Sequence, residues 1–400
     1  MPRDGTQRED DVTDRYGLTE FGYVAAGAAV LASGGGGSYR DAVAILDELA
    51  AEGKQWTVDV RAYDGCTAGC VLAMMGSPDA ATSLSLGELR RSCINTLDAL
   101  APAAGRPGCL IPVETGPINS IMPLIAAADM GLWVVDGDGA GRAVPELPQT
   151  TYGGSARLAA APCALGNDAD ARAEVETAVI GAPTAARVEA LAGGIVAAFG
   201  SFAGIALWPS NAGNGFALSG SYIPGTLGQA CALGRFLTMA AIPPSSAAVA
   251  ASVAAITGRA ASVAVANFYI TQVTQSTSGA SLDAGIIRLD NAPQAADSTA
   301  SCHLYNLNES LIAYSASGVA PLVVAPDSIC YYSEGTGRGF SNATNDLADY
   351  FDFAARRSTG VPVSLIRVAA APALCRAAGV VESFAGLLRQ LGYAGAVPGV

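Results

Sequence analysis

Histidine and lysine are almost absent from this chain of 400 residues, in which His303 and Lys54 are the only examples. A single histidine excludes any metal site that needs two or more histidines from one chain. A Ser-His-Asp or Cys-His arrangement would have to use His303, and a Schiff-base mechanism would have to use Lys54. Acid–base chemistry therefore falls mainly to Asp, Glu, Tyr or Cys side chains.

Long apolar runs are also lacking, although 51% of the residues are hydrophobic and the mean hydropathy is +0.35. Much of this content is alanine, which favours helices without implying a membrane. The richest stretch, residues 237–256, is interrupted by Pro243 and Pro244, which argues against a membrane-spanning helix. Residues 1–15 are charged and lack the apolar core of a secretory signal. We therefore expect a cytoplasmic chain that does not associate with membranes.

Basic residues are few, because 22 Lys and Arg stand against 35 Asp and Glu, which gives a net charge of −13. Such a field repels nucleic acid, and no basic cluster overrides it, so we expect no nucleic-acid partner. The nine cysteines are odd in number and scattered, which is typical of reduced thiols. We expect a small-molecule substrate, and the chain is a candidate homo-oligomer.

The length predicts two domains. Strands predicted at 56–63, 71–75, 109–113 and 132–135 alternate with helices, which indicates an α/β fold whose N-terminal domain, residues 1–257, has a mostly parallel sheet with flanking helices. Residues 258–400 are predicted to form a β-rich mixed α/β C-terminal domain, with a helix over 342–353. Residues 1–16 are expected to be a frayed tail, with Thr19 as an N-cap of the first helix.

Four consecutive glycines separate the first two predicted helices, in the sequence Ser33, Gly34, Gly35, Gly36, Gly37. Without Cβ atoms, such a loop can bring several backbone N–H groups to one point. The helix that follows would add a dipole favouring an anionic group. Since no Lys follows and no strand precedes, a nucleotide site is poorly supported. We predict that this loop binds substrate, and the alternative is a flexible linker.

A carboxylate and an amide follow the predicted strand at 109–113. Glu114 stands at the carboxyl end of that strand, where ligands bind in open α/β sheets, and Asn119 follows in the first helical turn. We predict a catalytic role for Glu114 and substrate binding for Asn119. The alternative is that Glu114 caps the helix.

Two further carboxylates, Asp136 and Asp138, alternate with glycines after the strand at 132–135, and Arg142 and Glu146 follow them. Asp136 and Asp138 have three interpretations: a divalent-cation site, a like-charge pair that serves as general acid or base, or an ion-pair network with Arg142. We predict catalytic roles for Asp136, Asp138 and Glu146 and substrate binding for Arg142.

Polar residues also cluster later in the chain. Asn214 lies in a predicted loop and is a candidate for substrate binding. Glu309 stands beside Asn308 between strongly apolar flanks, where a turn and a site role are both open. His303 follows Cys302 on a predicted strand and is interpreted as structural.

These segments together resemble the S-methyl thiohydantoin desulfurase family over nearly the whole chain. The most specific is the segment from Val135 to Leu147, with the sequence VDGDGAGRAVPEL. The others are residues 18–37, Met75-Gly76-Ser77-Pro78, residues 114–120, residues 223–230, Asn308-Glu309-Ser310-Leu311 and residues 325–329. The chain departs from the family pattern at Ser33, Thr115, Pro117 and Ser310.

The resemblance implies a hydrolase in which water displaces methanethiol from the S-methylated C2 carbon of a five-membered imidazolone ring and leaves a hydantoin. Asp136, Asp138 or Glu114 could move the proton if burial raises its pKa, and glycine-loop N–H groups could hold developing negative charge. Two alternatives stay open: a non-hydrolytic cyclase or isomerase of specialised metabolism that uses the same pocket, and a non-catalytic small-molecule-binding partner of a hydantoinase.

Overall fold

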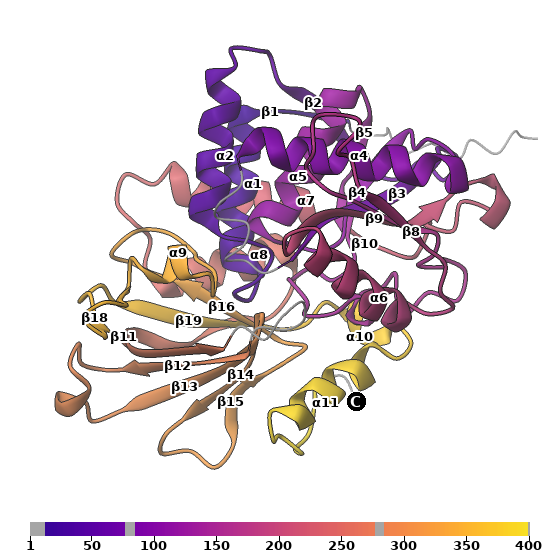
Figure 1. Cartoon of the computed structure of the whole chain (residues 1–400). Coiled ribbons are helices and arrows are strands. Elements are labelled where there is room, and N and C mark those ends of the chain that lie inside the picture. The colour runs from indigo at the N-terminus through magenta and orange to yellow at the C-terminus, as the bar shows by residue number, and fades with distance from the viewer. Residues whose placement is uncertain (1–12, 77–84, 277–283, 399–400) are drawn as a thin grey trace, which may run out of the picture.

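The computed structural model describes residues 13–76, 85–276 and 284–398, and its main feature is a pair of β-sheets with helices packed against them (Figure 1). The described strands of the larger sheet lie between residues 14 and 210, and those of the smaller between residues 261 and 368. The predicted fold class is confirmed: an α/β region with a parallel-containing sheet precedes a β-rich region. The domain division at 257 and 258 stays a prediction.

The first sheet has the strand order β1-β2-β5-β4-β3-β9-β7-β8. Its strands are β1 Asp14–Gly17, β2 Thr57–Arg61, β3 Gly69–Gly76, β4 Cys109–Pro112, β5 Trp133–Val135, β7 Cys163–Gly166, β8 Thr177–Ile180 and β9 Phe202–Ser210. The neighbours β2, β5, β4 and β3 run parallel, and the outer strands pair antiparallel. The carboxyl ends of the parallel strands therefore meet at one edge, where the loops after β4 and β5 lie.

Helices cover both faces of this sheet. They are α1 Leu18–Leu31, α2 Tyr39–Ala51, α4 Leu86–Ala104, α5 Pro117–Met130 and α6 Ala185–Ala198. Helix α7 Thr226–Thr238 packs against α1, and α8 Ser246–Thr257 packs against the second sheet. Alternation along β3 explains the two layers, because Leu72 and Met74 pack with α1, α4 and α5, whereas Val71 and Ala73 pack with α6.

The alanine-rich α1 is an internal helix, packed most extensively against α7. Gly27 and Gly234 lie at the crossing, where a Cβ on either would run into the backbone of the other helix. The small residues therefore allow two helix backbones to approach closely, and they account for part of the high hydropathy. In the parts of the chain that the structure describes, no helix is both long and apolar enough to cross a membrane.

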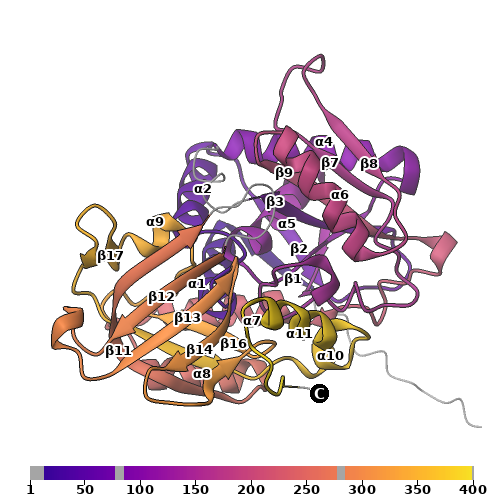
Figure 2. The ribbon, with the colours of Figure 1, turned by 60° about the horizontal axis from the view of Figure 1, so that its bottom comes forward.

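The second sheet is antiparallel throughout and has the order β15-β14-β13-β12-β11-β19-β16 (Figure 2). Its strands are β11 Ala261–Ser276, β12 Ala284–Asp290, β13 Ser301–Leu307, β14 Glu309–Ser315, β15 Pro321–Val324, β16 Ser328–Tyr332 and β19 Val363–Val368. The later helices are α9 Thr344–Leu347, α10 Pro372–Arg376 and α11 Val380–Gln390. The turn between β13 and β14 brings Asn308 and Glu309 to the first sheet's loops.

Short elements complete the fold. Strand β6 Gly137–Asp138 pairs with β10 Ile223–Pro224, and β17 Phe351–Asp352 pairs with β18 Arg357–Ser358. Single 3₁₀ turns occur at Leu147–Gln149, Ala212–Asn214 and Ala295–Asp297.

Three local predictions are wrong. Only Thr344–Leu347 of the helix predicted over 342–353 is helical, because Tyr350 stacks on Phe340, with ring centroids 4.1 Å apart, and the chain then forms β17. The end of the predicted tail forms β1 against β2, while residues 1–12 lie outside the described residues. The N-cap of α1 is Gly17, whose N–H donates to Glu20 at 2.8 Å, and Thr19 lies inside the helix.

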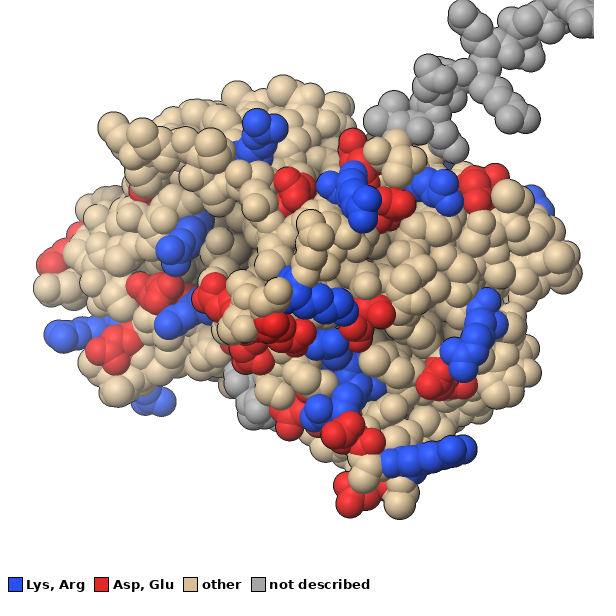
Figure 3. Space-filling view, turned by 90° about the horizontal axis from the view of Figure 1, so that it is seen from above, with Lys and Arg blue, Asp and Glu red and all other residues tan. Residues whose placement is uncertain are grey.

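Acidic and basic side chains are mixed on the face of the molecule seen in Figure 3, where Lys and Arg lie among Asp and Glu. No large patch of one sign stands out on that face. The absence of a nucleic-acid partner stays a prediction.

Candidate active site

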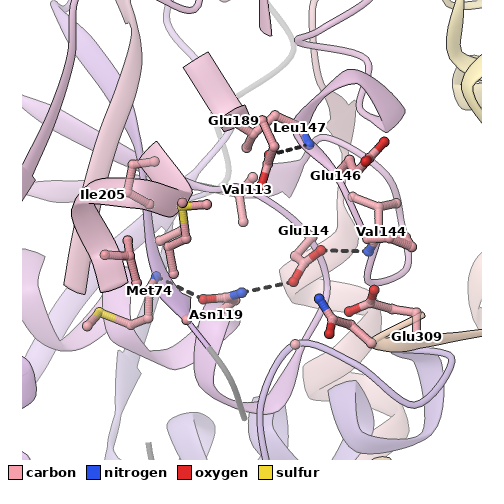
Figure 4. A pocket seen from close by; sticks show the side chains of 18 of the residues that line it. Met74, Val113, Glu114, Asn119, Val144, Glu146, Leu147, Glu189, Ile205 and Glu309 are labelled. Atoms are coloured by element: carbon pink, nitrogen blue, oxygen red, sulfur yellow. Dashed lines mark hydrogen bonds between the residues drawn. The ribbon is translucent and has the colours of Figure 1, made fainter. Parts of the chain in front are cut away.

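A cavity of about 460 Å³ lies where loops of the first sheet meet the turn between β13 and β14 (Figure 4). Its walls come from the glycine loop, β3, the segment from Val113 to Asn119, the segment from Val144 to Pro148, one face of α6, and Asn308 with Glu309. The volume falls in the range of roughly 300–1,000 Å³ that is usual for small-molecule sites. Segments distant in sequence therefore converge on one pocket.

The polar side chains of the described lining are all carboxylic acids and amides. They are Glu114, Asn119, Glu146, Glu189, Asn308 and Glu309. The described lining contains no Lys, Arg, His, Ser, Thr, Cys or Tyr, and its other residues are apolar or glycine. Such a pocket disfavours anionic ligands and suits a neutral or cationic ligand that donates N–H groups. It also offers no hydroxyl or thiol nucleophile among the described lining residues.

Glu114 is held as an oriented carboxyl group in the loop between β4 and α5. Its Oε1 accepts a hydrogen bond from Asn119 Nδ2 at 2.8 Å, and its Oε2 accepts one from the Val144 N–H at 2.7 Å. Asn119 is fixed in turn, because its Oδ1 accepts the Met74 N–H at 3.0 Å. Glu114 is 5% exposed, and burial raises its pKa to about 7 against these two donors. A pKa near neutrality suits a general acid or base.

Glu309 is the first residue of β14 and is 4% exposed. Among the described residues, its Oε2 atom has no hydrogen-bond partner. An unpartnered buried polar atom costs roughly 1–3 kcal/mol, so Oε2 is a candidate contact for a ligand. Burial, followed by the charge of Glu114, raises the pKa of Glu309 well above its ordinary value. Burial therefore favours the protonated form of Glu309.

Arg142 supplies a positive charge behind these two acids. It is 1% exposed, does not line the cavity, and its charge lowers the pKa of both Glu114 and Glu309. Its guanidinium donates to four backbone carbonyl groups, those of Ala143 at 2.8 Å, Asp327 at 2.9 Å, Pro326 at 3.1 Å and Ser310 at 3.2 Å. One cation facing two buried carboxyl groups favours a state in which one acid is ionised and the other keeps its proton.

The glycine loop is divided between lining the cavity and holding the two sheets together. Gly36 and Gly37 line the cavity, whereas Ser33, Gly34 and Gly35 do not. Ser33 Oγ donates to the Ser310 carbonyl at 3.2 Å and accepts the Ile329 N–H at 2.9 Å. The Gly34 carbonyl accepts the Asn342 N–H at 2.8 Å. A Cβ on Gly35 would collide with the carboxyl group of Glu309, so glycine is needed there.

The helix that follows this loop already has an anion at its N-terminus. The Asp346 carboxylate accepts hydrogen bonds from Ser38 Oγ at 2.8 Å and from the N–H groups of Tyr39 and Arg40, both at 3.0 Å. The negative charge that the helix dipole of α2 favours is therefore supplied by the chain itself.

Asp136 and Asp138 lie outside the cavity lining, and each carboxylate is engaged by its own surroundings. Asp138 accepts Thr115 Oγ1 at 2.6 Å and the N–H groups of Ala140 at 2.7 Å and Gly141 at 2.6 Å. Asp136 accepts the Gly228 N–H at 3.0 Å near the start of α7. Burial raises the pKa of both groups.

No three or more His, Cys, Asp or Glu side chains are grouped to hold a metal ion in the described parts of the chain. The cation at Asp136 and Asp138 stays a prediction, as do catalytic roles for these residues.

Glu146 and Glu189 line the same cavity. Burial raises the pKa of Glu146, and burial together with the charge of Glu146 raises the pKa of Glu189 to about 7. Glu189 Oε2 accepts the Leu147 N–H at 2.9 Å, which ties α6 to the segment after Glu146.

Asn214 lies away from the cavity. Its Oδ1 accepts the Asn211 N–H at 3.0 Å and its Nδ2 donates to the Pro209 carbonyl at 2.8 Å, so it stabilises its own loop. Of the predicted site residues, Glu114, Asn119, Glu146, Gly36 and Gly37 line one cavity. The sequence prediction omitted Glu189, for which no motif gave a signal. It left Glu309 open, although the Asn308-Glu309 motif marked it.

Comparison with known proteins gives the same family for both halves of the chain. The model of the S-Me-THD-like N-terminal domain matches residues 19–177, and that of the S-Me-THD-like C-terminal domain matches residues 183–347. Ser77 and Pro78 of the Met75 motif fall within the first match but lie outside the described residues.

A protein from Chromobacterium violaceum, solved by X-ray crystallography as a structural-genomics target, is 25% identical to this chain with a TM-score of 0.76. The superposition covers 96% of this chain and 100% of that one. No curated protein gives a significant match. Because the two family models together span most of its length, the chain belongs to the S-Me-THD-like family, the family whose motifs its sequence carries.

Proposed function

We propose that the chain hydrolyses a five-membered imidazolone ring of the S-methyl thiohydantoin type, releasing methanethiol and leaving a hydantoin. One observation carries this proposal: buried Glu309, whose Oε2 atom has no hydrogen-bond partner among the described residues, shares a cavity with the oriented carboxyl group of Glu114. Family membership supplies the substrate class. In this proposal the nucleophile is a water molecule, because the described lining offers no hydroxyl, thiol or amine.

The first step uses the two acids in opposite protonation states. Glu309, with its pKa well above the ordinary value, donates its proton to the ring nitrogen of the C2=N bond. This makes C2 more electrophilic. Glu114 in its ionised form, which the Val144 and Asn119 donors stabilise, takes a proton from water while the water oxygen forms a bond to C2. The product is a neutral tetrahedral adduct that carries hydroxyl and S-methyl groups on C2.

The second step reverses both proton transfers. The C2–S bond breaks, the proton on Glu114 goes to the departing sulfur, and methanethiol leaves. The C2 hydroxyl gives its proton back to Glu309 as the carbonyl group forms. One water is consumed, one methanethiol is released, and both acids return to their starting states. General acid–base steps of this kind contribute roughly 10²–10⁴-fold to a rate.

The cavity also suits the ring. Imidazolone rings carry N–H groups, and Asn119, Asn308 and the glutamates offer amide or carboxyl oxygens to receive them. A ring that gains a proton becomes cationic, and the described lining contains acids but no Lys or Arg to oppose it. Apolar neighbours such as Val113, Ile118 and Met75 would face the ring plane and the S-methyl group.

Methanethiol release tests the proposal. A 2-methylthio-imidazolone is incubated with the full chain, and volatile thiol is measured in the headspace by gas chromatography, because the nine protein cysteines would react with a thiol reagent. We expect release that falls at least about 100-fold in Glu309→Gln and in Glu114→Gln. Glu176→Gln is the matched control, since Glu176 is exposed and lies outside the cavity. Equal release by all four proteins would overturn the proposal.

A second candidate is a non-hydrolytic isomerase that moves a proton between two ring positions. An acid–base pair within a largely apolar lining favours it, since such a pair can shuttle a proton without water. An isomerase predicts deuterium exchange at a ring carbon without loss of methanethiol, which the same incubation in D₂O detects by mass spectrometry.

A further inference from the structure

We propose that Glu189 on α6 is the specificity-determining residue of this site and holds an amine, guanidinium or other cationic group on the C5 substituent of the ring. This inference rests on the proposed function for its substrate class and adds which members of that class are preferred. In Figure 4, Glu189 and Glu146 lie above Val113, whereas Glu114 and Glu309 lie below it. The two pairs of acids thus occupy different parts of one cavity.

The cavity has room for such a substituent. Its volume of about 460 Å³ falls in the range of drug-sized ligands, which leaves space beyond a five-membered ring. The unpartnered Oε2 atom of Glu309 independently marks this cavity as a place for a polar ligand. A ring placed at Glu309 and Glu114 would direct its substituent along the remaining length of the pocket.

The face of α6 toward the cavity is built around Glu189. Ala186, Ala190, Gly193 and Gly194 line the cavity beside it at helical spacing, and Glu189 is the only polar side chain of α6 in the lining. Small neighbours leave the carboxyl group accessible from the cavity. One of its oxygens, Oε2, accepts the Leu147 N–H at 2.9 Å, which fixes the direction of the group.

Glu189 has no cationic partner in the part of the chain that the structure describes. No Lys or Arg within the described residues forms an ion pair with Glu189 or Glu146. Burial and the nearby charge of Glu146 raise the pKa of Glu189 to about 7, and the Leu147 N–H only partly offsets this rise. A cationic ligand group would stabilise the ionised form of Glu189, and a carboxylate on the ligand would be repelled.

The test compares three ring compounds that differ only at C5: 3-aminopropyl, butyl and 2-carboxyethyl. Their hydantoins are used for affinity by calorimetry, and their S-methyl derivatives for kcat/KM from methanethiol release. We expect the aminopropyl compound to exceed the butyl compound by about ten-fold or more in both measures, with the carboxyethyl compound weakest. In Glu189→Gln the preference for the aminopropyl compound over the butyl compound should vanish in both measures.

Glu189→Gln keeps an oxygen that can accept the Leu147 N–H, so it preserves the local structure. Glu176→Gln, which removes the same charge from the surface, should keep the amine preference. Equal affinity for the amine and the butyl compound, or an undiminished amine preference in Glu189→Gln, would overturn the inference. Because calorimetry needs no turnover, amine-selective binding without methanethiol release would refute the proposed reaction and still support the role of Glu189.

Discussion

Glu114→Gln should change how the stability of the protein depends on pH. The pKa of Glu114 is about 7 in the folded chain, against an ordinary value of 4.5. Below pH 4.5 the Glu114 carboxyl group is protonated in both the folded and the unfolded chain, so it does not lower the free energy of unfolding. As pH rises from 4.5 to 7, the unfolded chain ionises while the folded chain keeps the proton. The free energy of unfolding then falls by up to about 1.4 kcal/mol per pH unit, or about 3 kcal/mol in all.

Glu114→Gln removes this pH-dependent fall in the free energy of unfolding but introduces a smaller loss of stability at every pH. The carbonyl of the introduced glutamine can still accept the Val144 N–H, whereas its NH₂ group would face the NH₂ group of Asn119, whose Oδ1 is held by Met74. One hydrogen bond lost in this way costs about 1 kcal/mol at every pH. The variant should therefore be less stable than the unaltered chain by about 1 kcal/mol at pH 4.5 and more stable by about 2 kcal/mol at pH 8.

Urea denaturation at half-unit steps between pH 4.5 and 8 measures this difference. Glu309 and Glu189 also have raised pKa values, so stability of the unaltered chain should decline over the same window. Glu176→Gln controls for the lost surface charge. Parallel curves for Glu114→Gln and the unaltered chain would contradict the raised pKa, because Glu114 would then be titrating at its ordinary pKa in the folded state.

Three further variants test separate parts of the site. Glu309→Gln should reduce kcat at least about 100-fold while circular dichroism stays unchanged, and an unaffected kcat would contradict its role as the acid. Gly35→Ala should lower kcat/KM about ten-fold or more, because the added Cβ would collide with the Glu309 carboxyl group. The control is Gly22→Ala on α1, where the added Cβ meets nothing within 4 Å and should stabilise the helix by about 0.5–1 kcal/mol. Ser33→Ala should lower the free energy of unfolding by roughly 1–3 kcal/mol, since it leaves the buried Ile329 N–H without an acceptor; an unchanged urea midpoint would show that the two sheets do not depend on this contact.

The part of the site that could be predicted from the sequence lies directly after a parallel strand. Glu114 and Asn119 come directly after a buried parallel strand, and the edge of a parallel sheet is where such residues gather. The same logic pointed to Asp138, whose two oxygens are occupied by Thr115 and by the N–H groups of the next turn. That outcome depends on the local path of the backbone, which residue types alone do not specify.

The remaining acids reach the cavity through long-range packing. Glu189 reaches the cavity on α6, which covers the opposite face of the sheet from α1. In the sequence, Glu189 cannot be told apart from an acidic residue on the solvent face of a helix. Glu309 comes from a different sheet, nearly two hundred residues after Glu114, and Ser33 fixes the approach of that sheet to the glycine loop. Contacts of this kind follow from how the two sheets dock, which no local pattern encodes.

The helix predicted over 342–353 failed for a related reason. Its residues satisfy helical spacing, yet Tyr350 is used in an aromatic stack with Phe340, and Asp346 caps the start of α2 from across the molecule. Tertiary contacts outweigh a helix propensity that amounts to fractions of a kcal/mol per residue.

A single turnover in H₂¹⁸O, with enzyme in excess over an S-methyl imidazolone, tests most directly whether Glu309 and Glu114 drive attack by water. The mechanism predicts one ¹⁸O atom in the C2 carbonyl of the hydantoin, one methanethiol per ring, and formation of both products at least about 100-fold slower in Glu309→Gln. Unlabelled hydantoin in the first turnover would show that a carboxylate oxygen attacks C2, and methanethiol release that does not depend on Glu309 would contradict the proposed role of this acid.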